Sequence, residues 1–311
     1  MKLIYFCIFI VFILTAPAYP QLWGYYLKNS IPYDKHEHYW ENRFTNLTVL
    51  CFTGITVTST DCIIPELTNE QALFKKAKQR GIALIPHVTF KNAKSGIAFL
   101  THPHHWEKTI QKLAYAIHTN GWAGCHFDFE YLPPKYAANF AQFLKTFRAI
   151  VPDISLSAAM FPQVEFNPTH AAFHDYSLLS AYLDAIVLMC YDHHNPKTKP
   201  GPVTSVAWSR KNIDYALKFF NAHQIWLGIP AYGYIWKNGM YYSVITMRSL
   251  PKYMSLYSNY RHSSGTVVIE YTQNKNHYIA YVPDSKLQNQ LCELATSYKL
   301  KGIALWRLGF E

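Results

Sequence analysis

Eight short apolar segments, rich in β-branched and aromatic residues, recur along this chain and constrain its fold more than any other feature. Segments with the apolar spacing of helices separate most of them. Near-continuous apolar strands that alternate with helices predict a parallel sheet with a covered outer face. The strands are expected at residues 22–27, 47–55, 82–90, 124–130, 154–161, 183–191, 225–234 and 301–308. Eight such units predict an α/β fold of the (β/α)8 TIM barrel type.

The segments between the strands carry the usual signals for helix ends. Residues 68–71 (Thr-Asn-Glu-Gln) have the pattern of a capping box, and the helix that they open should stop at Gly81. A second helix, with apolar residues from 106 to 117, should end at Gly121. The remaining helices are expected over residues 136–147, from Ser209 onward and from Ser285 to about Tyr298.

Residues 235–284 interrupt the alternation of strands and helices. They contain a hairpin-like pair of strands around residues 274–276, which indicates a small lobe inserted between barrel strands seven and eight. No internal repeat, low-complexity tract or Pro/Gly-rich linker indicates a second independent domain. We therefore expect residues 19–311 to form one barrel with an insertion at about 235–284.

The first eighteen residues have the composition of a signal peptide. Lys2 is followed by an apolar run over residues 3–14 and by the cleavage pattern Ala16-Pro17-Ala18. The run is short for a membrane span, although an uncleaved anchor is an alternative. The sequence predicts a protein that is secreted, periplasmic or in the cell envelope, with no stable membrane insertion after cleavage.

Charge and cysteine content narrow the choice of partners. The formal net charge is +10, but Lys and Arg are scattered, so we expect no nucleic acid partner. The charge fits solubility or weak attraction to an anionic envelope polymer. Of six cysteines, Cys7 lies in the signal segment, and Cys51 and Cys62 could bridge in an oxidising compartment. The sequence contains no C-x-x-C pair, which argues against a cysteine-based zinc module. It predicts neither a metal nor a cofactor.

The segment "GCHFDFEYLPP" (124–134) carries the chemistry. His126, Asp128 and Glu130 alternate, so an extended strand places them on one face, while Phe127 and Phe129 point the other way. A buried strand must direct its acids into a polar site. Other candidates lie near the carboxyl ends of expected strands, where barrel active sites form: Tyr25, Tyr191, Asp192, Tyr232 and Trp306. Carboxylates beside aromatic rings are typical of a sugar-binding site.

These segments resemble glycoside hydrolase family 18, the chitinase-like barrels. "AGCHFDFE" (123–130) matches the last two acids of the family pattern D-x-x-D-x-D-x-E. "MCYD" (189–192), "LGIPAYG" (227–233) and "GIALWRLG" (302–309) are similar to its sixth, seventh and eighth strand motifs. "FDFEYLPP", "GPVTSVAW" (201–208) and "YVPD" (281–284) look closest to the bacterial spore-germination and cell-wall branch. The likeness covers nearly the whole mature chain.

The resemblance implies a role for each matching residue. Glu130 would protonate the glycosidic oxygen and then activate water. Asp128 would hold the N–H of the substrate's N-acetyl group, and Tyr191 would donate to its carbonyl oxygen as the oxazolinium forms. Substrate-binding roles would fall to Asp192, Trp306, Tyr232, Tyr25 and His126. The implied activity is hydrolysis of β-1,4 bonds in N-acetylglucosamine-containing glycans of the peptidoglycan or chitin type.

Two positions depart from the family pattern. Ala123 replaces the first aspartate and His126 the middle one, which in the family lies beneath the residue that matches Asp128. His126 could instead donate a hydrogen bond to Asp128, or be a hydrogen-bonded core residue. These departures keep open a second function, that of a catalytically weak or inactive carbohydrate-binding protein. The partner in either case is an N-acetylated polysaccharide or oligosaccharide, and the oligomeric state is left open.

Overall fold

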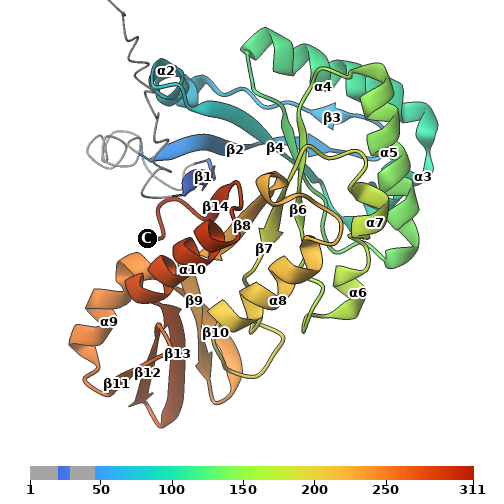
Figure 1. Cartoon of the computed structure of the whole chain (residues 1–311). Helices are drawn as coiled ribbons and strands as arrows, with labels where there is room; N and C mark the ends of the chain where they lie inside the picture. The colour runs from blue at the N-terminus through green and yellow to red at the C-terminus, as the bar shows by residue number, and fades with distance from the viewer. Residues whose placement is uncertain (1–19, 29–45) are drawn as a thin grey trace, which may run out of the picture.

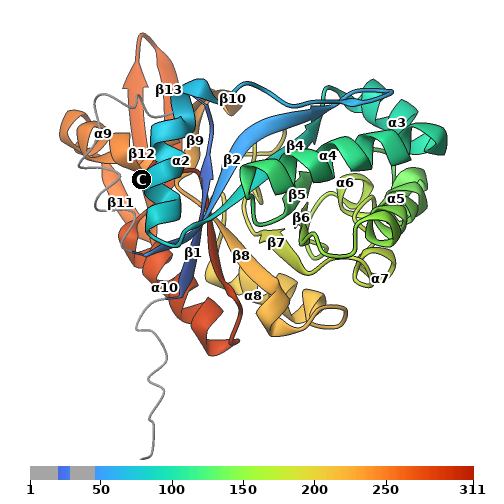
Figure 2. The same ribbon diagram turned by 90° about the horizontal axis from the view of Figure 1, so that it is seen from above.

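The computed structural model describes residues 20–28 and 46–311, so the predicted signal peptide at 1–18 lies outside the described residues. Within them, eight parallel strands form a closed barrel (Figures 1 and 2). Strand β1 pairs with both β14 and β2, which closes the sheet. The barrel strands are β1 (Gln21–Tyr26), β2 (Leu47–Val57), β4 (Ala83–Phe90), β5 (Cys125–Asp128), β6 (Leu156–Met160), β7 (Ala185–Met189), β8 (Ile225–Pro230) and β14 (Gly302–Trp306). The predicted TIM barrel is confirmed.

Helices surround the barrel, as Figure 2 shows. Helix α4 ends where predicted, because Gly121 adopts the left-handed φ of 58° that a helix C-terminus favours. The helices that cover the barrel are α2 (Gln71–Gln79), α3 (Ala93–Thr101), α4 (Trp106–Asn120), α5 (Ala137–Ile150), α6 (Pro168–Ala171), α7 (Tyr176–Leu179), α8 (Val206–Ala216) and α10 (Ser285–Ser297). None of the described helices is both long enough and apolar enough to span a membrane.

Two predicted helix starts are wrong. Helix α8 begins at Val206 because the Ser205 hydroxyl accepts a hydrogen bond from the Trp208 amide, which leaves Ser209 buried inside the helix. The expected capping box at 68–71 does not form. Residues 68–70 are a short 3-10 turn ahead of α2, and no side chain caps either start.

An aromatic shell packs between β5 and helix α5. Phe127 and Phe129 are fully buried, and their rings contact Phe143 and Phe140 with centroid distances of 5.6 Å and 5.3 Å. Burying such side chains stabilises the fold by roughly 1.5–3 kcal/mol each. Since successive strand residues face opposite sides, this packing fixes His126 and Asp128 on the inside of the barrel.

The barrel interior beneath the strand ends is filled by a second, smaller apolar cluster. Trp23 and Trp226 pack there edge to face, with ring centroids 5.5 Å apart, beside Cys51. Cys62 belongs to the outer core instead. The two thiols therefore lie on different sides of the sheet, and both are free, so they form no bridge. Cys125 and Cys190 face the helices, as predicted.

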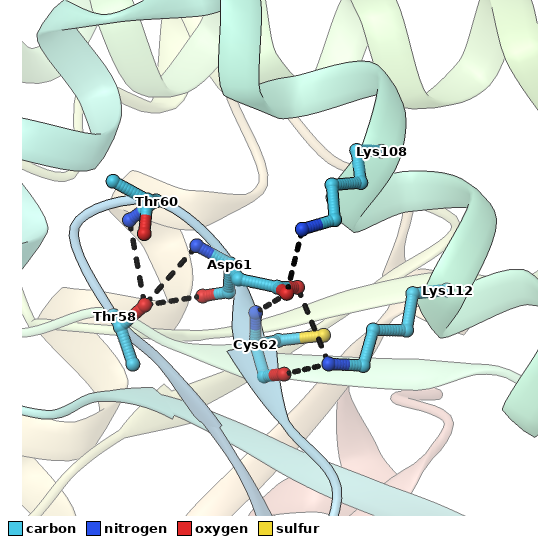
Figure 3. A network of polar contacts seen from close by, with 6 residues as sticks. All are labelled: Thr58, Thr60, Asp61, Cys62, Lys108 and Lys112. Atoms are coloured by element: carbon cyan, nitrogen blue, oxygen red, sulfur yellow. Dashed lines mark hydrogen bonds and ion pairs between the residues drawn. The ribbon is translucent and has the colours of Figure 1, made fainter.

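The turn after β2 is held against helix α4 by a polar network, drawn in Figure 3. It leads into β3 (Cys62–Ile63), which pairs antiparallel with the end of β2. The Asp61 carboxylate lies 3.1 Å from the Lys108 ammonium and 3.3 Å from that of Lys112, and it accepts from the Cys62 amide at 2.7 Å. The network anchors the carboxyl end of β2, which extends beside the carboxyl end of β4, to helix α4.

A second, antiparallel sheet is inserted between β8 and β14 and forms the orange lobe of Figure 1. The predicted hairpin around residues 274–276 is confirmed as the pair of strands β12 (Thr266–Gln273) and β13 (Asn276–Pro283). The expected strand over 225–234 is in fact two strands, because only Ala231 separates β8 from β9. The lobe contains β9 (Tyr232–Lys237), β10 (Met240–Thr246), α9 (Leu250–Leu256), β11 (Tyr260–Ser263), β12 (Thr266–Gln273) and β13 (Asn276–Pro283).

The lobe is joined tightly to the barrel. The Ala231 amide donates to the Trp306 carbonyl at 2.8 Å, and the Ala231 carbonyl accepts from the Met247 amide at 3.0 Å. At Gly233 a side chain is excluded, because a Cβ there would lie 1.8 Å from the Tyr281 carbonyl oxygen. This close approach lets β9 pair with β13 directly beside the carboxyl end of β8.

Candidate active site

Asp128 is the last residue of β5, and Glu130 follows it two residues later. Both line a cavity of about 190 Å³ at the carboxyl ends of the barrel strands. Tyr25, Tyr191, Asp192, Tyr232 and Trp306 line the same cavity. The structure thus brings together seven of the eight residues that the sequence singled out. The exception is His126.

The pKa values of the two carboxyl groups, Asp128 and Glu130, are shifted in opposite directions. Burial raises the pKa of Glu130 well above its ordinary value, and the negative charge of Asp128 raises it further. Burial also acts to raise the pKa of Asp128, but His87, through its charge and hydrogen bond, outweighs this and lowers it. Of the two groups, Glu130 is therefore the one that binds a proton more strongly.

The contacts of Asp128 agree with this proton assignment. Its Oδ2 accepts a hydrogen bond from His87 Nε2 at 2.7 Å. Its Oδ1 is buried and has no hydrogen-bond partner among the described residues. A buried acceptor without a donor costs roughly 1–3 kcal/mol, so a proton between the two carboxyl groups stabilises the site. The same Oδ1 is free to accept a hydrogen bond from a ligand.

His126 lies beneath the cavity rather than in its lining, and it does not bond Asp128. It is fully buried, and its Nε2 lies 2.8 Å from the Tyr25 hydroxyl. Its Nδ1 lies 3.0 Å from the Ser157 hydroxyl, which in turn donates to the Cys125 carbonyl at 3.3 Å. Because Ser157 donates onward, it accepts from His126 Nδ1–H, which leaves Nε2 to accept from Tyr25. Burial, with the neighbouring charge of His87, lowers the pKa of His126 to about 3, so the ring is neutral.

Asp192 follows strand β7, and the hydroxyl groups that contact it come from tyrosines on strand β9. Asp192 has a positive φ of 61°, a conformation that is uncommon outside glycine and that Asp tolerates. Tyr232 and Tyr234, both from β9 of the lobe, donate to Asp192 Oδ1 at 2.6 Å and 2.7 Å. Burial raises the pKa of Asp192, although these two hydrogen bonds act against it. The lobe therefore shapes one wall of the cavity.

Aromatic rings form the floor of the cavity. Trp306, the last residue of β14, stacks at 22° to Tyr191 with ring centroids 6.4 Å apart, and it packs against Tyr25 at 5.1 Å. Burial raises the pKa of Tyr191 well above its ordinary value, so its hydroxyl stays protonated and is a donor. The indole of Trp306 is partly exposed and lies in the same cavity as the carboxyl groups of Asp128 and Glu130. A pyranose ring could stack on this indole with its glycosidic oxygen near Glu130.

A second cavity, of about 530 Å³, continues from the first and shares Tyr131, Phe166 and Asp192 with it. Its wall includes His170 from α6 and Lys197 from the loop after β7. Among residues 20–28 and 46–311, Lys197 has no ion-pair partner, since the nearby Glu165 pairs with Lys211. The two cavities together form a cleft that is long enough for more than one sugar. The outer part of this cleft carries the ammonium group of Lys197, unpaired within the described residues.

Several functional residues lay outside the sequence prediction. His87 contacts Asp128, Tyr234 donates to Asp192, and Tyr131 lines the cavity beside Glu130. Tyr131 has a φ of 58°, which for a bulky residue marks a strained position of the kind found at active sites. A signal for His87 was present, because it alternates with Ala83 and Ile85 and lies near the end of its strand. In the described part of the chain, no group of three or more His, Cys, Asp or Glu side chains is placed to hold a metal ion.

Comparison with known proteins identifies the fold and the family. The chain matches the family model "Glycosyl hydrolases family 18" over residues 21–311. Among solved structures it is similar to a chitinase from Chromobacterium violaceum ATCC 12472, with a TM-score of 0.82, 18% identity, and coverage of 94% of this chain and 95% of that one. The spore cortex-lytic enzyme SleL of Bacillus megaterium QM B1551 also gives a TM-score of 0.82, at 20% identity over 95% of this chain and 72% of that one.

Curated relatives come from Bacillus subtilis (strain 168). The "Cortical fragment-lytic enzyme" is 26% identical over 205 residues, which cover 61% of this chain and 47% of that protein. The uncharacterized glycosylase YvbX is 26% identical over 204 residues, or 62% of this chain and 59% of that protein. The aligned part thus spans about half to three-fifths of the length of these relatives. With the family model matched across the barrel and its lobe, the chain belongs to glycosyl hydrolase family 18.

Proposed function

We propose that the protein is an exported hydrolase that cleaves β-1,4 bonds in N-acetylglucosamine-containing glycans, of the peptidoglycan or chitin type, with retention of configuration. The observation that carries the proposal is the pair of buried carboxyl groups with opposite pKa shifts in one cavity. Glu130 holds a proton to give to the glycosidic oxygen, and Asp128 is an acceptor beside it. The relatives named as a chitinase and as cortex-lytic enzymes support the same substrate class.

The spacing of the pair favours assistance by the substrate itself. In ordinary retaining glycosidases two carboxyl groups lie about 5–5.5 Å apart, and in inverting ones about 6.5–9.5 Å apart. Here Asp128 ends β5 and Glu130 follows it two residues later in the lining of the same cavity, which favours a place on one side of the sugar over a pair that flanks the scissile bond. The attacking atom is then the carbonyl oxygen of the sugar's own N-acetyl group. Asp128 Oδ1 accepts from the acetamido N–H, and the Tyr191 hydroxyl donates to the acetamido oxygen.

The decisive experiment compares wild type with Glu130→Gln, with reducing ends released from chitooligosaccharides and from peptidoglycan as the readout. Loss of the acid should lower kcat by about 10²–10⁴-fold, because a positioned general acid contributes that much. Glu107→Gln, an exposed glutamate on α4, is the matched control and should leave kcat unchanged. Equal turnover by Glu130→Gln and wild type would refute the assignment. Wild type that binds these glycans without cleaving them would instead indicate a carbohydrate-binding protein.

A second arm tests the part played by the N-acetyl group. Oligosaccharides with free amines should bind in the cleft and resist cleavage, because they lack the attacking carbonyl oxygen. NMR of the first products should show the β-anomer, which retention requires. Rapid cleavage of the free-amine substrate, or initial release of the α-anomer, would contradict substrate assistance while leaving the role of Glu130 intact.

A further inference from the structure

His87 makes a buried contact with Asp128 that the sequence motifs do not contain. It lies on β4, the neighbour of β5, and its Nε2 donates to Asp128 Oδ2 at 2.7 Å. Only 5% of the His87 side chain and 14% of the Asp128 side chain are exposed. A charge-assisted hydrogen bond in so dry a place is stronger than one at the surface. It fixes one oxygen of Asp128 and turns the other away from β4.

The other titratable groups around Asp128 cannot take this role. His126 and His174 have lowered pKa values, to about 3 and about 4, because both are buried. Their ring nitrogens are also engaged elsewhere, since His174 bonds the Phe129 carbonyl and the Phe161 amide. The remaining neighbours are neutral or acidic: Tyr25 on β1, Cys51 on β2, Glu130 and Tyr131 after β5, and Tyr191 and Asp192 after β7. Among the described residues, His87 is thus the basic group that contacts this carboxylate.

We propose that His87 is a positioning residue, which keeps Asp128 ionised with Oδ1 directed to Glu130, so that the proton shared by the two acids resides on Glu130. The proposal rests on the proposed function of the same site. In this proposal, His87 on β4 determines which of the two adjacent carboxyl groups, Asp128 or Glu130, is the general acid. His87 needs no contact with the glycan to do so, because it acts only through Asp128.

The sign of the expected pH effect follows from the surroundings. Burial favours the protonated form of Asp128, and His87 is the strongest influence that opposes it, so loss of His87 raises the pKa of Asp128. Protonated Asp128 no longer accepts the acetamido N–H as an anion, so activity falls at a higher pH than in wild type. The low-pH limb of kcat against pH therefore moves upward when His87 is lost, while KM changes little.

The test measures kcat and KM from pH 4 to 9 for wild type, His87→Gln and His87→Ala. His87→Ala should move the low-pH limb upward by about one pH unit or more and lower kcat roughly tenfold at a pH on that limb. His87→Gln keeps an N–H donor without the charge, so it should recover much of the neutral-pH activity and still show a raised limb. His118→Ala is the matched control, since His118 pairs with Asp153 at 3.0 Å on the surface.

The outcomes separate this proposal from the proposed function. If wild type cleaves glycan and His87→Ala gives the wild-type pH profile, the positioning role is refuted. It is refuted equally if His87→Gln and His87→Ala both lower kcat by the same factor at every pH, as a packing defect would. If wild type itself is inactive, ¹³C NMR titration of the carboxyl groups still decides, because His87→Gln should raise the lowest buried aspartate pKa. Should His87→Ala fail to fold, His87→Gln carries both measurements.

Discussion

The two faces of the β5 segment are built on opposite principles. Phe127 and Phe129 point outward into a shell of aromatic rings, where shape and apolar area determine stability. His126, Asp128 and Glu130 point inward, where each polar group has a partner or awaits one. The outer face stabilises the strand by packing, and the inner face determines the hydrogen bonds and protonation of the site. Substitutions on the two faces should therefore give different kinds of loss.

The largest effect on stability is expected on the outer face. Phe127→Ala removes a fully buried ring that contacts Phe143 and Phe147, so the free energy of unfolding should fall by about 3–5 kcal/mol. Urea unfolding at pH 7 measures this loss. The kcat of the folded fraction should stay within about twofold of wild type, since no inner-face contact is changed. A large fall in kcat with unchanged stability would erase the distinction between the faces.

His126 provides a smaller, pH-dependent test of the inner face. Its pKa is lowered to about 3 in the fold, so between about pH 6.5 and 3 the unfolded chain binds one more proton. Stability should therefore fall as pH decreases, by about 1.4 kcal/mol per pH unit from this group. His126→Asn, which keeps a donor toward Ser157, should remove that part of the slope between pH 6.5 and 4.5.

Other groups titrate in the same window, so the difference between variant and wild type is the quantity to compare. Glu130 acts with the opposite sign, because its raised pKa makes the fold lose stability as pH rises. His174, whose pKa is lowered to about 4, adds to the acid sensitivity of both proteins. Parallel curves of unfolding free energy against pH for His126→Asn and wild type would show that His126 is not neutral in the fold.

The smallest effect is expected where the lobe supports the inner face. Tyr234→Phe deletes one of the two hydroxyl groups that donate to Asp192, which should cost about 1.5–3 kcal/mol of stability while Asp192 is ionised. The cost should shrink as pH falls and Asp192 becomes protonated in both proteins. Thermal unfolding at pH 7 and pH 4 gives both values. A cost that is equal at the two pH values would assign Tyr234 to packing alone.

The same contrast explains what could be read from the sequence. Alternation along one strand was enough to separate Asp128 and Glu130 from Phe127 and Phe129, because side-chain direction in a strand depends only on parity. The strand ends that carry Tyr191, Asp192 and Trp306 followed from the barrel and the family motifs. Ser209 was mistaken for a helix start because two serines stand four residues apart, and only the backbone shows which one caps.

The contacts between strands could not be read in this way. His87 lies level with His126 on the adjacent strand, and that register is set by how the whole barrel closes. Of the two alternatives for His126, the bond to Asp128 does not form and the hydrogen-bonded core residue is found, while the imidazole of His87 contacts that carboxylate. Likewise, the turn from β8 into β9 depends on hydrogen bonds from Ala231 to residues about 75 and 16 positions away, which no local pattern encodes.

Those two bonds of Ala231 bear on how a glycan can enter. A lid closes over its substrate by rotating about a hinge, and a hinge requires backbone that can change its dihedral angles freely. Here Ala231, the residue between β8 and β9, has both its amide and its carbonyl engaged, one of them with the backbone of Trp306 on the cavity floor. An outward rotation of the lobe would strain the two hydrogen bonds of Ala231, and with them the backbone of Trp306. The spacing between floor and lobe is thus fixed by these bonds, and a glycan bound as proposed would have to fit it without movement of the lobe.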